Sequence, residues 1–236
     1  MSKTLKQQNQ VSILLFALVN TCVITALLGG WENFTAFVSE VSKGNLAFIG
    51  RTLGVPAIAG LIAGVASWVV PRKVKETLVF WRVGPRCMPS SRAFSEIAHK
   101  DPRIDVKRLR ERVSEFPIAP SEQSSCWYSI YRKHQKEPAV EDASRAYLLY
   151  RDMTSLVPIV AITAVIVALL VALPAHPNWT AAIFLALEFL LTAVAARNAG
   201  TRLVANVLAI ESSDPASTTS RGATPTRRRT RKADST

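Results

Sequence analysis

Four long apolar stretches, separated by polar segments, dominate the pattern of this chain. Residues 11–31, 52–71, 156–173 and 179–196 contain no Lys, Arg or Asp and a single Glu. About 20 helical residues span roughly 30 Å, the hydrocarbon thickness of a bilayer. The pattern therefore predicts an all-α integral membrane protein with four transmembrane helices in two hairpins. A soluble chain of this length could hardly bury four helices that lack a polar face.

The polar segment between the hairpins shows helical periodicity and clear chain breaks. Gly84 and Pro85 interrupt it, Asp105 is placed to cap a helix, and apolar residues of 106–116 recur at helical spacing. Another helix is expected to begin after Pro138 and to lead toward the third span. We therefore expect a cytosolic N-terminus at 1–10, a transmembrane hairpin at 11–71, a small helical cytosolic module at 72–153, a second hairpin with a helical extension at 154–211, and a disordered basic tail at 212–236.

The segment 31–42, between the first two apolar stretches, has its large apolar residues at helical spacing. It is interpreted either as an amphipathic helix on the outer leaflet or as an ordinary connecting loop. Trp31 and Trp179 lie at predicted outer ends of spans, and Trp68 lies near a predicted inner end. These positions suit the membrane interface, where amphipathic rings are enriched.

The formal net charge of +12 is unevenly distributed along the chain. Basic residues concentrate before the first stretch, between the hairpins and after the last stretch. Lys and Arg are retained on the cytoplasmic side of a membrane. The distribution predicts a multi-pass protein of the bacterial inner membrane with both termini and the module in the cytoplasm. This topology explains the charge better than nucleic-acid binding does.

Glu188 is an acidic residue near the middle of the fourth apolar stretch. An ionised side chain at mid-membrane costs about 2.5–3.5 kcal/mol, so it should face protein or water, or be protonated. The first stretch carries Asn20, Thr21 and Thr25, whose side chains seek polar partners on neighbouring helices. Glu188 is therefore a candidate for an ion path, as a ring of carboxylates in a symmetric oligomer. The alternatives are a structural hydrogen bond to Asn20 or Thr21 and a tolerated isolated carboxylate.

Two further groups of residues suit a membrane setting. Gly60 and Gly64, four residues apart, would let two helix backbones approach closely, and they are the predicted helix-packing face. Basic residues at the cytoplasmic surface are expected to contact lipid headgroups. These are Arg72, Lys73 and Lys75 after the second stretch, and Arg227, Arg228 and Arg229 in the tail.

Several basic residues of the module lie near aromatic residues in the sequence. Guanidinium groups bind phosphate by paired hydrogen bonds, and aromatic rings stack on bases, so a nucleotide messenger is one candidate ligand. The alternative is a cytoplasmic surface whose arginines pair with Asp101, Asp105 and Asp142 and contact anionic lipid. The candidate ligand-binding or partner-binding residues are Arg86, Arg92, Arg103, Trp127, Tyr128, Arg132 and Lys133.

Cysteines, histidines and known catalytic motifs give no support to metal, cofactor or enzyme chemistry. Cys22, Cys87 and Cys126 form no Cys-x-x-Cys pair, and the histidines are scattered. The sequence has no HExxH zinc motif, no GxSxG nucleophile elbow and no phosphate-binding glycine loop. We therefore expect neither a cofactor nor an enzymatic activity.

Short blocks of the module carry a resemblance. They are Cys87, Arg92–Ser95, Asp101–Asp105, Glu122–Gln123, Trp127–Tyr128, Tyr131–Lys133 and Arg151–Asp152. In these blocks the chain resembles uncharacterised bacterial inner-membrane proteins with four spans and a cytosolic helical insert. The layout is also similar to that of small membrane effectors of antiphage systems. The resemblance implies a membrane location but no particular activity.

These patterns together predict an oligomeric inner-membrane effector or channel. Its cytosolic module would sense a partner protein or an anionic ligand, in the setting of antiphage defence. A monomer with four spans leaves little lumen, so a homo-oligomer is expected. The alternative is a non-catalytic scaffold that anchors a cytosolic partner protein at the membrane.

Overall fold

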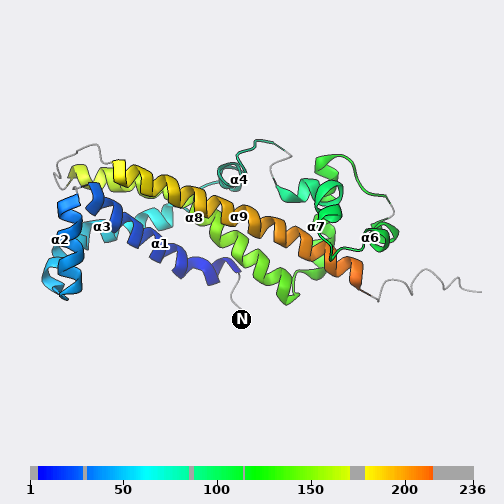
Figure 1. The fold of residues 1–236 in the computed structure, drawn as a ribbon, viewed down its shortest axis with the longest axis horizontal. Helices are drawn as coiled ribbons and strands as arrows, with labels where there is room; N and C mark the ends of the chain where they lie inside the picture. The colour runs from blue at the N-terminus through cyan, green and yellow to red at the C-terminus, as the bar shows by residue number, and fades with distance from the viewer. Residues whose placement is uncertain (1–4, 29–30, 85–87, 114, 171–178, 215–236) are drawn as a thin grey trace, which may run out of the picture.

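The computed structural model describes residues 5–28, 31–84, 88–113, 115–170 and 179–214, and these residues form helices and no strands. The molecule is elongated, with a module of short helices at one end and long helices that run from the other end into that module (Figure 1). The long helices and those beside them are α1 (Leu5–Leu28), α2 (Trp31–Ser42), α3 (Leu46–Ala66), α4 (Arg72–Phe80), α8 (Pro138–Leu170) and α9 (Trp179–Ser213). The predicted all-α class is therefore confirmed.

Four of these helices, α1, α3, α8 and α9, pack as a bundle. Helix α1 contacts both α3 and α8, and α8 packs along α9. Helices α1 and α3 run antiparallel, because Gly60 lies beside Leu18 while Gly64 lies beside Leu14. The bundle core consists of aliphatic side chains that include Ile13, Ile24, Leu156 and Val160.

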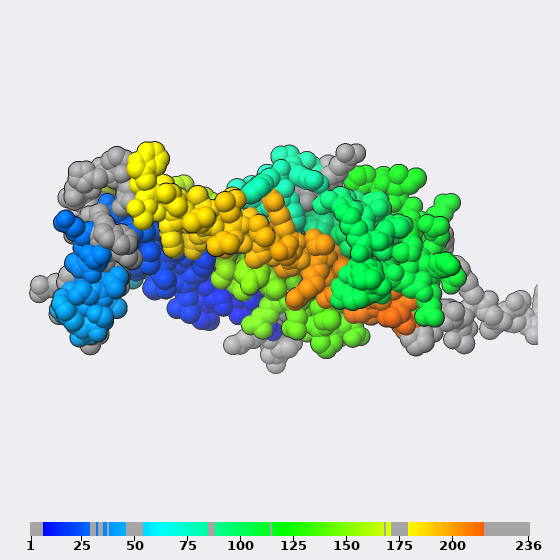
Figure 2. Space-filling model, in the orientation of Figure 1, coloured from blue at the N-terminus to red at the C-terminus, as the bar shows by residue number. Residues whose placement is uncertain are grey.

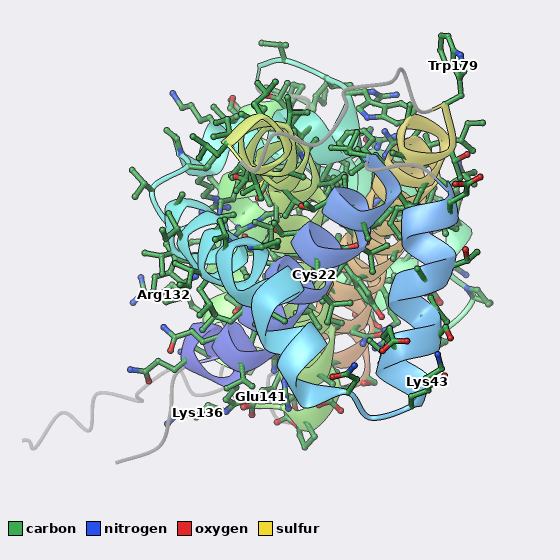
Figure 3. The ribbon with its side chains drawn as sticks, turned by 90° about the vertical axis from the view of Figure 1, so that its left-hand side faces the viewer. Cys22, Lys43, Arg132, Lys136, Glu141 and Trp179 are labelled. Carbon is green, nitrogen blue, oxygen red and sulfur yellow. The ribbon has the colours of Figure 1, made fainter. Side chains whose placement is uncertain are left out.

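Three helices are long and apolar enough to cross a membrane: the described ranges are Gln7–Leu28, Pro138–Val167 and Trp179–Ser213. Large apolar side chains such as Leu15, Ile162 and Leu191 are exposed on the outside of the bundle. Figure 3, which views the molecule along its length, places Cys22 inside the bundle and shows Trp179 projecting away from it. Such an apolar exterior suits lipid as the surrounding solvent.

The predicted second span, 52–71, is not one continuous helix. Helix α3 ends at Ala66, a turn follows, and α4 begins at Arg72. Pro71 disfavours helical conformation in the residue before it, and the Ser67 hydroxyl donates a hydrogen bond to the Gly64 carbonyl at 2.7 Å. Helix α3 nevertheless has 21 residues, of which Gly54–Ala66 is the apolar stretch with described side chains.

Residues 31–42 form helix α2, which decides between the helix and the loop expected there. Helix α2 lies across the end of the bundle, remote from the module (Figure 1). Its apolar Val38 and Val41 are exposed. The helical spacing of its apolar residues was therefore a valid signal.

The module consists of a 3₁₀ turn η1 (Pro89–Arg92), a π-helical turn η2 (Ala93–Ile97), and the helices α5 (Ala98–Lys100), α6 (Val106–Val113) and α7 (Pro120–His134). The Asp105 carboxylate caps α6 as expected, accepting the backbone N–H groups of Lys107 and Arg108 at 3.0 and 3.1 Å. The buried Gln123 joins α7 to η2, since its Oε1 accepts the backbone N–H of Phe94 at 3.2 Å.

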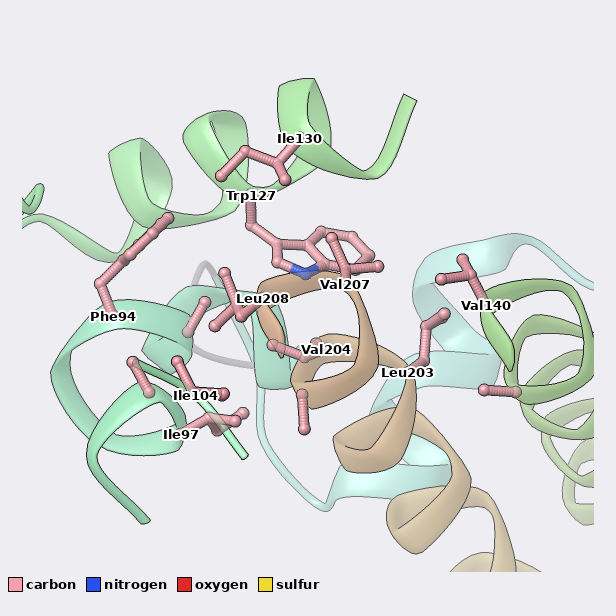
Figure 4. Close-up of a cluster of buried hydrophobic side chains, with 14 of the residues drawn as sticks. Phe94, Ile97, Ile104, Trp127, Ile130, Val140, Leu203, Val204, Val207 and Leu208 are labelled. Carbon is pink, nitrogen blue, oxygen red and sulfur yellow. The ribbon is translucent and has the colours of Figure 1, made fainter. Parts of the chain in front are cut away.

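The last part of α9 forms the centre of the module. Side chains from the short helices, including Phe94 and Trp127, pack around Leu203, Val204 and Leu208 of α9 (Figure 4). Helix α9 is a single helix that follows the bundle surface and continues into the module, as its yellow to orange path shows (Figure 2). The module core therefore extends beyond the predicted boundaries 72–153, because α9 contributes its central helix.

Candidate functional site

A cleft of about 570 Å³ opens where the turns of the module meet α9. We call it the basic cleft. It brings together residues from the segment 92–103 and from the middle of α9, which are close because η2 packs on α9. Its lining residues are Arg92, Glu96, Ile97, Lys100, Asp101, Pro102, Arg103, Thr201 and Ala205.

Ion pairs hold the charged side chains of the basic cleft in place. Glu96 accepts hydrogen bonds from Lys100 at 2.8 Å and from Arg92 at 2.7 Å. Arg103 lies 2.7 Å from the Asp101 carboxylate. Hydrogen bonds from Lys100 and from Arg103 hold the pKa values of Glu96 and Asp101, respectively, below their ordinary values of 4.5 and 3.8. Both carboxylates therefore remain ionised at neutral pH.

A smaller cavity of about 140 Å³ adjoins the basic cleft and shares Arg92 and Thr201 with it. We call it the arginine pocket. Its other lining residues are Phe80, Arg82, Pro89 and Arg197. It lies between the end of α4, η1 and α9.

Arg197 is fixed from two sides at the arginine pocket. Its Nε donates a hydrogen bond to the Val79 carbonyl at 2.6 Å, and its guanidinium lies 3.9 Å from the centre of the Trp81 ring. Trp81 ends α4 with a left-handed backbone conformation (φ 52°), and its N–H bonds to the Thr77 carbonyl. The left-handed turn thus ends α4 with the Trp81 ring beneath the arginine.

The structure divides the predicted ligand-binding residues among separate places. Arg92 and Arg103 meet in the basic cleft. Trp127 and Tyr128 instead line another cavity of about 470 Å³, which they share with Arg72. Arg132 and Lys133 lie farther along α7, and Arg86 lies outside the described residues.

Two of these residues, Trp127 and Lys133, make contacts within the protein. Trp127 is a core residue and stacks on Tyr131 with ring centres 5.3 Å apart. Lys133 Nζ lies 3.4 Å from Glu211, whose carboxylate is also 2.5 Å from the ring of His134. These contacts fasten α7 to the end of α9, where Arg112 also donates to the carbonyls of Glu211 and Asp214.

Sequence reasoning missed Arg82, Lys100, Arg197 and Thr201 as residues of this site. One feature of the sequence could have pointed to two of these residues. Arg197 and Thr201 are four residues apart just after the last apolar stretch, so they share one face of α9. The meeting of that face with residues 82–103 depends on tertiary packing, which the spacing does not reveal.

The polar residues of the bundle lie inside it. Asn20, Thr21 and Thr25 are buried; Asn20 donates to the Phe16 carbonyl of its own helix at 2.9 Å, and its side chain lies near Glu188. Thr21 donates to the Ala17 carbonyl of its own helix at 2.8 Å. One carboxylate oxygen of Glu188 is buried without a hydrogen-bond partner among the described residues, as is the Thr25 hydroxyl. The structure therefore places Glu188 near Asn20, while the hydroxyl of Thr21 and the amide of Asn20 donate to carbonyls of their own helix.

Gly60 and Gly64 face α1 at a close approach of the two helices. A Cβ atom on Gly60 would lie 2.8 Å from the Leu18 Cα, and one on Gly64 would lie 2.8 Å from a methyl group of Leu14. Backbones can pack this closely only where small residues occupy the interface.

The structure corrects the prediction that Lys75 contacts lipid headgroups. Its side chain is 4% exposed and its Nζ lies 3.1 Å from the Asp152 carboxylate. Arg151 also contacts that carboxylate, at 2.9 Å. An ammonium paired inside the protein cannot reach lipid, so Lys75 joins α4 to α8 instead. Of the other predicted lipid contacts, Arg72 pairs with Glu76 at 2.5 Å, Lys73 is exposed, and Arg227, Arg228 and Arg229 lie outside the described residues.

Comparison with protein-family models, curated proteins and solved structures found no match. Within the described ranges, no group of three or more His, Cys, Asp or Glu side chains is arranged to hold a metal ion. The functional argument therefore depends on the geometry of the basic cleft, the arginine pocket and the bundle.

Proposed function

We propose that this protein is an oligomeric inner-membrane effector whose cytosolic module senses an anionic ligand or a partner protein. Helix α9 would transmit the binding event to the membrane helices. One observation carries this proposal: α9 is a single helix of 35 residues that belongs to both the bundle and the module. A helix of that length extends about 20 Å beyond the hydrocarbon layer.

The two halves of α9 have different surroundings. Its first half exposes Leu187 and Leu191 on the bundle surface and carries Glu188. Its second half lines the basic cleft with Thr201 and Ala205 and forms the core of the module with Leu203 and Leu208. A ligand in the cleft would therefore contact the same rigid helix that holds the intramembrane carboxylate.

We further propose that α1, α3, α8 and α9 all cross the membrane, with both termini in the cytoplasm. The antiparallel packing of α1 on α3 supports two crossings joined by α2. The position of α2 across the end of the bundle suits a helix on the outer leaflet (Figure 1). The basic residues of the module then face the cytoplasm, in agreement with the retention of Lys and Arg on that side.

A non-conducting scaffold is the second candidate. The observation that favours it is the proximity of Glu188 to the buried Asn20, which would give the carboxylate a structural role inside one subunit. In the effector proposal the same pair would border an ion path in an oligomer, and movement of α9 would open it.

Membrane depolarisation after induced expression distinguishes the two functions. Glu188→Gln keeps the hydrogen-bonding side chain and removes the charge, whereas Glu188→Leu removes both. The effector proposal expects depolarisation by the parent protein and a clear reduction by both variants. Leu187→Ala, on the exposed face of α9, is the matched control and should behave as the parent. If correctly inserted parent protein changes no ion flux, the channel proposal is wrong and the scaffold remains.

A further inference from the structure

The arginine pocket holds more hydrogen-bond donors than the protein satisfies. Arg197 Nη2 and Arg92 Nε are buried and have no hydrogen-bond partner among the described residues. Both arginines line the pocket. Buried polar groups in folded proteins are nearly always paired, so two unpaired guanidinium nitrogens on residues that line one cavity favour an acceptor bound beside them.

The charges around the pocket point to an anion. Arg82 is close enough to Arg197 for the two positive charges to interact unfavourably. Among the described residues, Arg92 has the Glu96 carboxylate as its partner, whereas Arg82 and Arg197 form no ion pair with a carboxylate. A negative group placed between these arginines would relieve the repulsion.

The size and rigidity of the pocket limit what can enter. A volume of about 140 Å³ is a few times the roughly 30 Å³ that a water molecule occupies in the liquid. This volume suits a phosphate group, whose oxygens can accept several hydrogen bonds. The contacts of Arg197 with the Val79 carbonyl and the Trp81 ring fix its guanidinium in advance. A guanidinium group binds phosphate through two parallel hydrogen bonds, and one that is already held in place loses less conformational freedom on binding.

We propose that the arginine pocket binds the phosphate group of a phosphate ester, with Arg82, Arg92 and Arg197 as its donors, and that the basic cleft receives the rest of the ligand. This inference rests on the proposed function, because it names the class of ligand that the module senses. The adjoining cleft has both apolar and basic lining residues, including Ile97 and Arg103. Two sources can supply the ester: a soluble molecule such as a nucleotide, or a phospholipid, since Arg197 directly follows the last apolar stretch.

Binding there would connect three elements through one ligand. Arg82 follows α4, Arg92 belongs to η1 and Arg197 belongs to α9. A phosphate held by all three arginines would connect the end of α4 and η1 to α9, the helix that continues into the bundle. The site is therefore placed to influence α9 directly.

The test uses the full-length protein purified in detergent and depleted of lipid. Calorimetry measures the binding of adenosine 5′-monophosphate, with adenosine as the ligand that lacks phosphate. Mass spectrometry of protein taken directly from membranes measures retained phospholipid. The variants are Arg197→Gln and Arg82→Gln, and the matched control is Lys107→Gln on α6, an exposed residue outside both cavities. Arg82 is exposed, so its replacement tests the pocket even if Arg197→Gln fails to fold.

We expect one of two results: the protein binds the nucleotide but not adenosine, or it retains phospholipid. In either case, each arginine variant should lose about tenfold or more of that binding, whereas Lys107→Gln should not. The first result identifies a soluble ester and the second a lipid. The inference is overturned if neither ligand binds, or if Lys107→Gln weakens binding as much as Arg82→Gln. Such a failure leaves the depolarisation test of Glu188 unaffected, so the two proposals fail separately.

Discussion

Individual charged residues set the junction between the bundle and the module. Lys75 follows an apolar stretch, and that position alone predicts contact with lipid headgroups. Its carboxylate partner, Asp152, is 77 residues away in the sequence, and the pair forms only because α4 packs on α8. Burial of a charge depends on such distant partners, so a local pattern could not identify it. The positions of Gly60 and Gly64, in contrast, depend on helical spacing and could be read locally.

Replacing Asp152 with Asn tests the buried charge cluster. The change removes the negative charge that faces Lys75 and Arg151 while the shape of the side chain is kept. Removing one partner of a buried ion pair costs about 3–5 kcal/mol in free energy of unfolding. Thermal unfolding of the purified protein should show this loss.

The matched control for this change is Glu40→Gln, which breaks the exposed pair between Glu40 and Lys43 and should alter stability little. The double variant Lys75→Met with Asp152→Leu should recover only part of the lost stability, since it removes the buried ammonium but leaves Arg151 without its carboxylate. An Asp152→Asn protein as stable as the parent would show that the cluster does not hold α4 to α8.

At the scale of elements, periodicity and chain breakers were most informative where a helix is bounded by local signals. They predicted the cap of α6 at Asp105 and a helix after Pro138, and they left residues 31–42, which form α2, open between a helix and a loop. They did not predict that α3 ends at Ala66, because an apolar run continues past that residue to Pro71. They also did not predict that the end of α9 forms the core of the module, since that role depends on which surfaces meet.

The packing of α3 on α1 predicts a graded response to alanine. Gly60→Ala would place a Cβ 2.8 Å from the Leu18 backbone, which cannot rotate away, so the helices must separate. Overpacking of this kind costs about 1–3 kcal/mol. Gly64→Ala should cost less, because it meets the end of the flexible Leu14 side chain.

The control for both changes is Gly54→Ala, which meets no heavy atom within 4 Å. It should be neutral or should stabilise α3 by up to about 1 kcal/mol through helix propensity. Thermal unfolding of the three variants in one detergent measures the order. A Gly60→Ala protein as stable as the Gly54→Ala protein would contradict the close approach of the helices.

At the scale of the whole molecule, the structure combines an apolar bundle with a polar, basic module. The two parts lie along one long axis (Figures 1 and 2). The segregation of apolar and basic residues in the sequence predicted this division. The position of the site at the meeting point of module and bundle was not predictable, since it requires residues from 80–103 and 197–205 to meet. The proposed coupling requires the membrane to surround the bundle, with α2 on the outer side and the module on the cytoplasmic side.

Thiol labelling of intact cells tests that boundary most directly. Lys43→Cys, beyond α2, and Lys107→Cys, in the module, are introduced singly into protein whose Cys22, Cys87 and Cys126 are replaced by Ala. Both positions are exposed in the structure. We predict that a membrane-impermeant maleimide labels residue 43 in intact cells and residue 107 only after the inner membrane is opened. Labelling of residue 107 in intact cells with a closed inner membrane would place the module outside the cytoplasm and contradict the account.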